Sequence, residues 1–114
     1  MTIDDISYIM AQGNYFSFHK KFAKYLGLEE AIILGALINK YQYYFDQGKL
    51  TEDGMFFCTV NTLYEDTTLS EYKQRKAFKN LEENGIITTD IRGIPAKRYI
   101  KLNAENMINI LRKF

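Results

Sequence analysis

Eight basic side chains lie between residues 70 and 101, and side chains of this type are suited to contact with an anion. Lysine ammonium and arginine guanidinium groups donate hydrogen bonds to phosphate oxygens, and arginine can also donate two parallel bonds to a guanine edge. Four of the eight fall in the stretch SEYKQRKAFK, and three more surround the GIPA turn in RGIPAKR. Two alternatives follow: a basic surface for a phosphate backbone, or two ordinary solvated segments.

The charges are segregated along the chain, although the net charge is only +1. Residues 28–69 carry two cations against seven acids, a net charge of −5. Residues 70–101 carry eight cations against four acids, a net charge of +4. A near-neutral chain with one basic segment is what electrostatic attraction at a single face requires.

The remaining reactive side chains predict no catalytic or metal site. His19 is the only histidine and Cys58 the only cysteine, and neither belongs to a cluster with metal-ligand or nucleophile–base spacing. Cys58 lies in the apolar run MFFC, which predicts a buried thiol. We therefore expect no enzyme activity, no cofactor and no metal.

Length and composition predict a folded chain in a reducing compartment. The 114 residues are 46% apolar and 25% charged, which is typical of one globular domain. No signal peptide is visible, and the longest nonpolar run, residues 31–38, is far shorter than the roughly 20 residues that a membrane span needs. We expect a cytoplasmic protein of a bacterial host with no membrane association.

Helices and strands must position the basic residues, and capping residues and periodicity predict where these elements lie. Ser70 is placed to cap a helix that Gly85 ends, and Thr59 is placed to cap the helix before it. The predicted helices are 3–12, 19–27, 28–47, 60–66, 70–84 and 104–114, and the predicted strands are 15–18, 55–59, 86–92 and 97–103.

This order of elements predicts an α+β fold, mostly α, of the winged helix-turn-helix type with extra N- and C-terminal helices. We expect one domain, 1–114, with an N-terminal extension (1–27), a winged-helix core (28–103) and a C-terminal helix (104–114). The helix at 28–47 is apolar nearly all round, so it is expected to pack on the core and also on the N-terminal segment or a second copy. The helices at 28–47 and 104–114 are the candidate surfaces for a homodimer.

The helix at 70–84 and the hairpin at 92–98 are the candidate DNA-binding elements. On the DNA-binding hypothesis, the outward helix residues enter a major groove and the hairpin cations meet the flanking backbone. The candidate DNA-binding residues are Ser70, Tyr72, Lys73, Arg75, Lys76, Lys79, Arg92, Lys97 and Arg98.

The stretch TLSEYKQRKAFKNLEENGII, followed by RGIPAKRYIKLN, resembles the winged-helix domains of Gram-positive phage and plasmid replication proteins, the replisome organisers and DnaD-like initiators. The resemblance covers about residues 15–103 and rests on Leu69-Ser70, on Leu81-Glu82 through Gly85-Ile86, and on Gly93 through Tyr99. It implies that 70–84 is a recognition helix and that the hairpin is a wing. It also implies that Gln74 faces inward, where a buried amide is expected to bond to the backbone of the preceding turn. Full initiators carry further regions downstream, so the chain is either a stand-alone small protein or a fragment of a longer one.

These observations predict a DNA-binding protein of a phage, plasmid or mobile element. Its role would lie in replication initiation or transcription control, its partner would be double-stranded DNA, and it would act as a homodimer with a replisome protein as a further possible partner. The alternative is a winged helix that binds only proteins, in replisome assembly or as an anti-repressor, because fold alone does not fix function.

Overall fold

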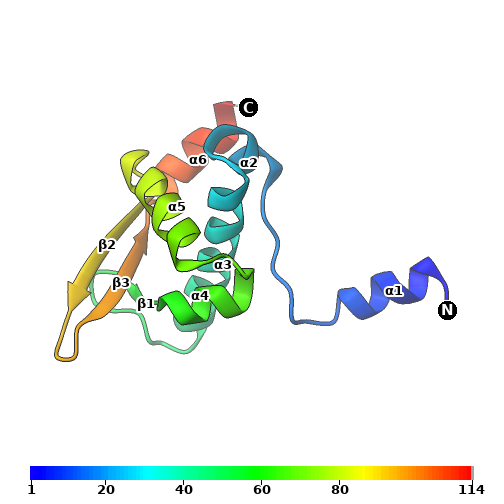
Figure 1. The fold of residues 1–114 in the computed structure, drawn as a ribbon, viewed down its shortest axis with the longest axis horizontal. Helices are drawn as coiled ribbons and strands as arrows, with labels where there is room; N and C mark the ends of the chain where they lie inside the picture. The colour runs from blue at the N-terminus through cyan, green and yellow to red at the C-terminus, as the bar shows by residue number, and fades with distance from the viewer. Residues whose placement is uncertain (114) are drawn as a thin grey trace.

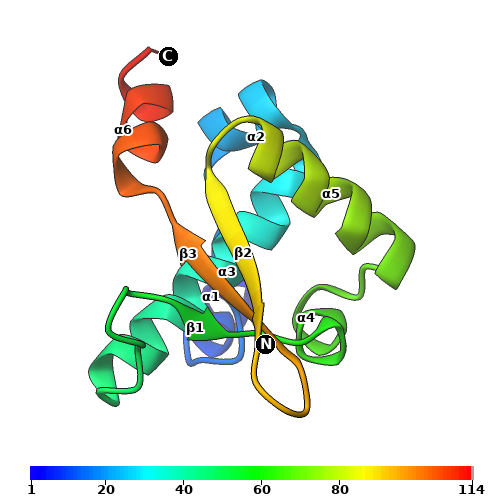
Figure 2. The same ribbon diagram turned by 90° about the vertical axis from the view of Figure 1, so that its left-hand side faces the viewer.

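The fold is organised around a long central helix, α3 (Leu28–Asp46), in a computed structural model that describes residues 1–113. Three further helices and the sheet surround it (Figures 1 and 2). In chain order the other elements are α1 (Ile3–Met10), α2 (Lys20–Leu26), β1 (Phe56–Phe57), α4 (Val60–Thr67), α5 (Glu71–Glu83), β2 (Ile87–Arg92), β3 (Lys97–Leu102) and α6 (Ala104–Lys113).

Helix α3 is buried on more than one side, as its apolar pattern predicted. The buried side chains of α3 cover more than half of its circumference, and they are Ala31, Ile33, Leu34, Ala36 and Leu37. Helices α2, α4 and α5 all contact α3, and Leu63 of α4 and Leu81 of α5 complete the same core. The position of α5 is therefore fixed by burial against α3.

The three strands form an antiparallel sheet in the order β1-β3-β2. Ile100 of β3 is fully buried and faces Phe56 of β1 on one side and Thr89 of β2 on the other. Strands β2 and β3 form a hairpin that extends beyond the helices (Figure 2). The mostly helical α+β fold with a protruding hairpin is winged-helix-like, as the order of elements predicted.

The helix ends lie where the capping residues placed them. Ser70 Oγ accepts a hydrogen bond from the Lys73 amide at 3.3 Å, and Thr59 Oγ1 accepts one from the Thr62 amide at 3.0 Å. Gly85, with φ +69°, follows α5 in a left-handed conformation that favours glycine. The predicted α5 and its hairpin are thus confirmed to within one or two residues.

The predicted strand at 15–18 is wrong. These residues have no strand partner and cross α3 instead, where the Ser17 carbonyl lies against Gly35 and Phe16 packs on the edge of the core. Alternating aromatic residues favour a strand locally, but a strand forms only where another strand can pair with it. The contact of α3 with the N-terminal segment was one of the two predicted alternatives.

The apolar stripe of helix α6 packs against the rest of the domain. Ile110 is buried, Met107 and Leu111 pack on the core, and Lys21 Nζ of α2 donates to the Leu111 carbonyl at 3.0 Å. This stripe is therefore already covered, whereas Ile108 is exposed. The predicted end of the helix, Phe114, lies outside the described residues. Within residues 1–113, no helix has both the length and the apolar content needed to span a membrane.

Gly35→Ala is expected to lower the free energy of unfolding by about 1–3 kcal/mol, because the new Cβ would overlap the Ser17 carbonyl. In an ordinary helix interior the same replacement stabilises by roughly 1 kcal/mol, so the sign is diagnostic. Urea denaturation of the two proteins measures it. A stabilising effect would contradict the close approach of residue 17 to α3.

Candidate nucleic-acid interface

Helix α5 presents a basic outer face because its other side is buried. Ala77, Phe78 and Leu81 face the core, which leaves Lys76 and Lys79 exposed on the opposite side. Tyr72 lies one turn before Lys76 and is 66% exposed. These three predicted residues therefore share one solvent-facing stripe.

Three other predicted residues at the start of α5 already have partners. Ser70 is the N-cap, Lys73 Nζ lies 3.6 Å from a Glu29 carboxylate oxygen, and Arg75 Nη2 lies 3.7 Å from Glu71. Both ion pairs are largely exposed, so their contribution to stability is small. Lys73 and Arg75 can therefore exchange their carboxylates for phosphate oxygens at little cost.

Gln74 is a structural residue, as predicted. Its side chain is 1% exposed, and its Nε2 donates to the Leu69 carbonyl at 2.9 Å and to the Val60 carbonyl at 3.1 Å. These bonds join the start of α4 to the turn before α5. The angle between α4 and α5 therefore depends on this buried amide.

Arg98 is partly buried between the hairpin and α5. Its guanidinium carbon lies 4.3 Å from the centre of the Phe78 ring, and its Nε donates to the Cys58 carbonyl at 3.2 Å. Both contacts link β3 to other elements, so Arg98 has a structural role beside its predicted role in binding. Cys58 itself is buried, and burial raises the pKa of its thiol.

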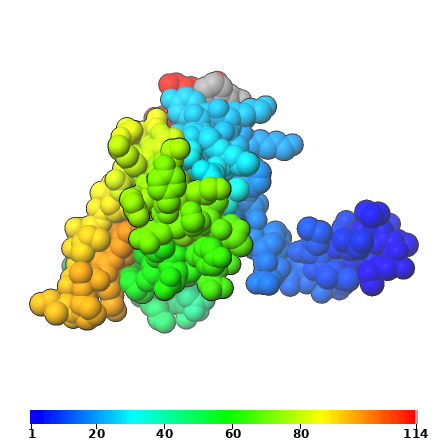
Figure 3. All heavy atoms as spheres, viewed as in Figure 1, coloured from blue at the N-terminus to red at the C-terminus, as the bar shows by residue number. Residues whose placement is uncertain are grey.

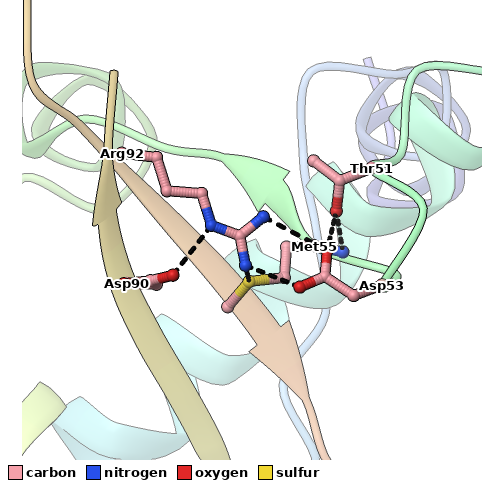
Figure 4. A network of polar contacts seen from close by, with 5 residues as sticks. All are labelled: Thr51, Asp53, Met55, Asp90 and Arg92. Carbon is pink, nitrogen blue, oxygen red and sulfur yellow. Dashed lines mark hydrogen bonds and ion pairs between the residues drawn. The ribbon is translucent and has the colours of Figure 1, made fainter. Parts of the chain in front are cut away.

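Arg92, predicted as a hairpin cation for DNA, is held by two carboxylates (Figure 4). Its Nη2 and Nη1 donate to the Asp53 carboxylate at 2.6 and 3.2 Å, and its Nε donates to Asp90 at 2.8 Å. The hydrogen bonds from Arg92 hold the pKa of Asp53 well below its ordinary value, and the two carboxylates raise the pKa of Arg92. The charge of Arg92 is thus balanced within the protein.

The hairpin divides the predicted cations between its two faces. Alternate side chains of a strand point to opposite faces, and Arg98 contacts Phe78 of α5, whereas Lys97 Nζ lies 5.1 Å from the centre of the Phe57 ring. Arg92 stacks near Tyr99 on the same face as Lys97. The helix and hairpin cations therefore do not all point the same way. A single DNA-binding face that used all of them would need them to do so.

A hollow of about 310 Å³ between α5 and the hairpin brings three of the predicted cations together. Arg75, Lys79 and Arg98 line it, together with two acids, Glu71 and Glu82. Glu82 accepts a hydrogen bond from Thr89 Oγ1 at 2.6 Å and Glu71 pairs with Arg75, so both acids of this hollow are already engaged. The basic surface is therefore the outer stripe of α5 extended into this hollow.

Sequence reasoning missed two residues of the hairpin region. Asp53 holds Arg92 although 39 positions separate them, and no local pattern indicates that pairing. Ile94 is fully exposed at the hairpin tip, between Gly93 and Pro95. The sequence did contain a signal for Ile94, because it is an apolar residue in a predicted turn, where the core does not need it.

The comparisons with known proteins bear on the fold. No protein-family model and no curated protein matches the chain. A solved structure described as the N-terminal domain of a DNA-binding protein matches with a TM-score of 0.66 and 18% identity, covering 99% of this chain and 92% of that one. A second, described as a Rep–DNA complex, matches with a TM-score of 0.65 and 18% identity, covering 99% and 93%. This chain shares their fold.

Arg98→Gln is expected to lower the free energy of unfolding by about 1–3 kcal/mol, because it removes the bond to the Cys58 carbonyl and the contact with Phe78. Lys97→Gln makes the same change of charge at the neighbouring, exposed position and is expected to stay within about 0.5 kcal/mol of the parent. Urea denaturation of both variants measures the difference. Equal effects would show that Arg98 has no structural role.

Proposed function

We propose that this chain is a DNA-binding domain that acts in the replication of a phage, plasmid or mobile element. The observation that carries the proposal is the outer stripe of α5, where Tyr72, Lys76 and Lys79 are exposed. In a helix-turn-helix, α5 would be the second helix, the one that enters the DNA groove. The shared fold supports it, since one of the two similar proteins is described as DNA-binding and the other is described in a complex with DNA.

In the proposed mechanism, α5 lies in a major groove. Lys76 and Lys79 donate to phosphates on the sides of the groove, and Arg75 is long enough to reach a guanine edge once it leaves Glu71. The hairpin tip rests on the flanking backbone, with Lys97 as its exposed cation. Phosphate contacts then supply most of the affinity, and binding weakens steeply with salt.

Two chains are proposed to bind together. One helix-turn-helix unit covers a short half-site, and proteins of this kind usually reach specific affinity as dimers on two half-sites. Transcription control at such a site is possible with the same contacts, because a bound dimer blocks or recruits other proteins whatever its primary role.

A protein-binding role without DNA is the second candidate, and the charge pairing supports it. Lys73, Arg75 and Arg92 all face carboxylates of the chain itself, which is how solvated surfaces balance their charges. On this reading the acidic segment 28–69 binds a replisome protein. The two experiments below separate the candidates.

Lys76→Gln with Lys79→Gln is expected to weaken binding to a duplex of about 25 base pairs roughly tenfold and to reduce the salt slope by about 2, because two phosphate contacts are lost. Fluorescence anisotropy at several salt concentrations measures both quantities. Arg112→Gln with Lys113→Gln removes the same charge on α6 and serves as the control. No binding by the parent at low salt would favour the protein-binding candidate.

Asp53→Asn is expected to strengthen DNA binding several-fold at low salt, because Arg92 loses its main carboxylate and becomes available to a phosphate. The salt slope should rise by about 1 as one contact is added. Glu52→Gln removes the same charge from the neighbouring exposed residue and controls for the general loss of repulsion. Equal effects of the two variants would show that Arg92 takes no part in binding.

A further inference from the structure

The first 18 residues, here called the N-terminal arm, extend away from the rest of the molecule. Helix α1 projects from the body in the ribbon and space-filling views, and none of its residues is buried (Figures 1 and 3). Its start is nevertheless well defined, because Thr2 and Asp5 form a reciprocal capping box. The chain therefore specifies a helix that its own core does not use.

Helix α1 has an apolar side that calls for a partner. Ile3, Ile6, Ile9 and Met10 lie within one arc of the helix and are 75%, 43%, 56% and 68% exposed. A helix of eight residues is only marginally stable in water without such contacts. Four large exposed apolar side chains on so short a helix indicate that a surface covers them in the functional state.

An open groove lies at the base of the arm. Residues 11–19 form one wall and α3 forms the other, enclosing a hollow of about 680 Å³. Ile38 of α3 and Tyr15 of the arm are its exposed apolar residues, at 37% and 62%. The wall formed by the arm is held in place by the contact of Ser17 with Gly35. Helix α1 itself projects away from α3 and the rest of the body (Figure 1).

We propose that α1 of a second copy of this chain occupies the groove, so that two copies exchange their arms. Each copy offers one unfilled groove and one uncovered apolar helix, and a two-fold arrangement satisfies both on both copies. The inference deepens the proposed pairing of two chains and rests on that pairing, but it does not depend on DNA binding.

Charge complementarity favours a second copy as the occupant. The arm carries Asp4 and Asp5 and no cation, whereas α2 carries three lysines. Lys20 is exposed at the start of α2, next to His19, which lines the groove. An incoming acidic helix therefore meets a basic rim. Helix α1 of a second copy supplies both the acidic residues for this rim and the apolar side chains for the groove.

Sedimentation equilibrium of the full chain tests the exchange. The parent is expected to be a dimer at tens of micromolar. Ile6→Glu on the apolar side of α1 and Ile38→Glu in the groove are each expected to weaken the dimer at least tenfold. Tyr8→Glu adds the same charge to the opposite side of α1 and is expected to leave the dimer intact. Because Ile6 lies outside the core, circular dichroism of the Ile6→Glu protein should match the parent.

Mixing the two weakened variants distinguishes exchange between copies from the folding back of each arm on its own body. In the mixture, the intact arm of the Ile38→Glu chain can occupy the intact groove of the Ile6→Glu chain, so dimers of intermediate strength should form. No recovery on mixing would overturn the proposal. A parent that stays monomeric at about 200 micromolar would overturn it too, because its dissociation constant would then be too high for a stable dimer. Anisotropy with DNA is read separately, so a monomer that still binds DNA would refute the exchange and leave the DNA-binding function standing.

Discussion

Burial of α3 on several sides is the constraint on which the rest of the structure depends. Each large apolar side chain that it buries contributes roughly 1.5–3 kcal/mol, and α2, α4 and α5 all pack on it to obtain that burial. Asn80 of α5 adds a directional contact, since its Nδ2 donates to the Leu26 carbonyl at the end of α2 at 2.9 Å. The side of α5 that faces α3 is thereby fixed, and the opposite side, with Lys76 and Lys79, is left to solvent.

Much of this arrangement could be predicted because its signals are local. Ser70, Thr59 and Gly85 set helix ends through bonds or backbone angles within a few residues, and the GIPA turn sets the hairpin. Interactions over long distances along the chain could not be predicted. The pairing of Arg92 with Asp53 depends on how the loop after α3 folds back on β2, and the local pattern at 15–18 gave no sign that a partner strand was missing.

The cations of the basic segment that pair with carboxylates fall into two kinds, and the difference bears on the proposed DNA binding. The pairs of Lys73 with Glu29 and of Arg75 with Glu71 are long and exposed, so a phosphate can replace either carboxylate. Arg92 instead makes short bonds to two carboxylates. Because the pKa of Asp53 is lowered, this interaction is complete above the ordinary aspartate pKa of about 3.9 and is lost only as the pH falls through the lowered value. At neutral pH the hairpin base therefore stays tied to the loop at residues 51–55.

The proposed arm exchange and the proposed DNA surface are compatible in space. In Figure 1 the hairpin and the arm lie at opposite ends of the molecule, while α5 lies on the side toward the viewer. If the two copies were related by a two-fold axis parallel to this viewing direction, their arms could meet while both α5 helices stayed on the same side of the dimer. Because each arm would reach the other copy, the length of the arm would set the distance between the two α5 helices and hence the spacing of the half-sites.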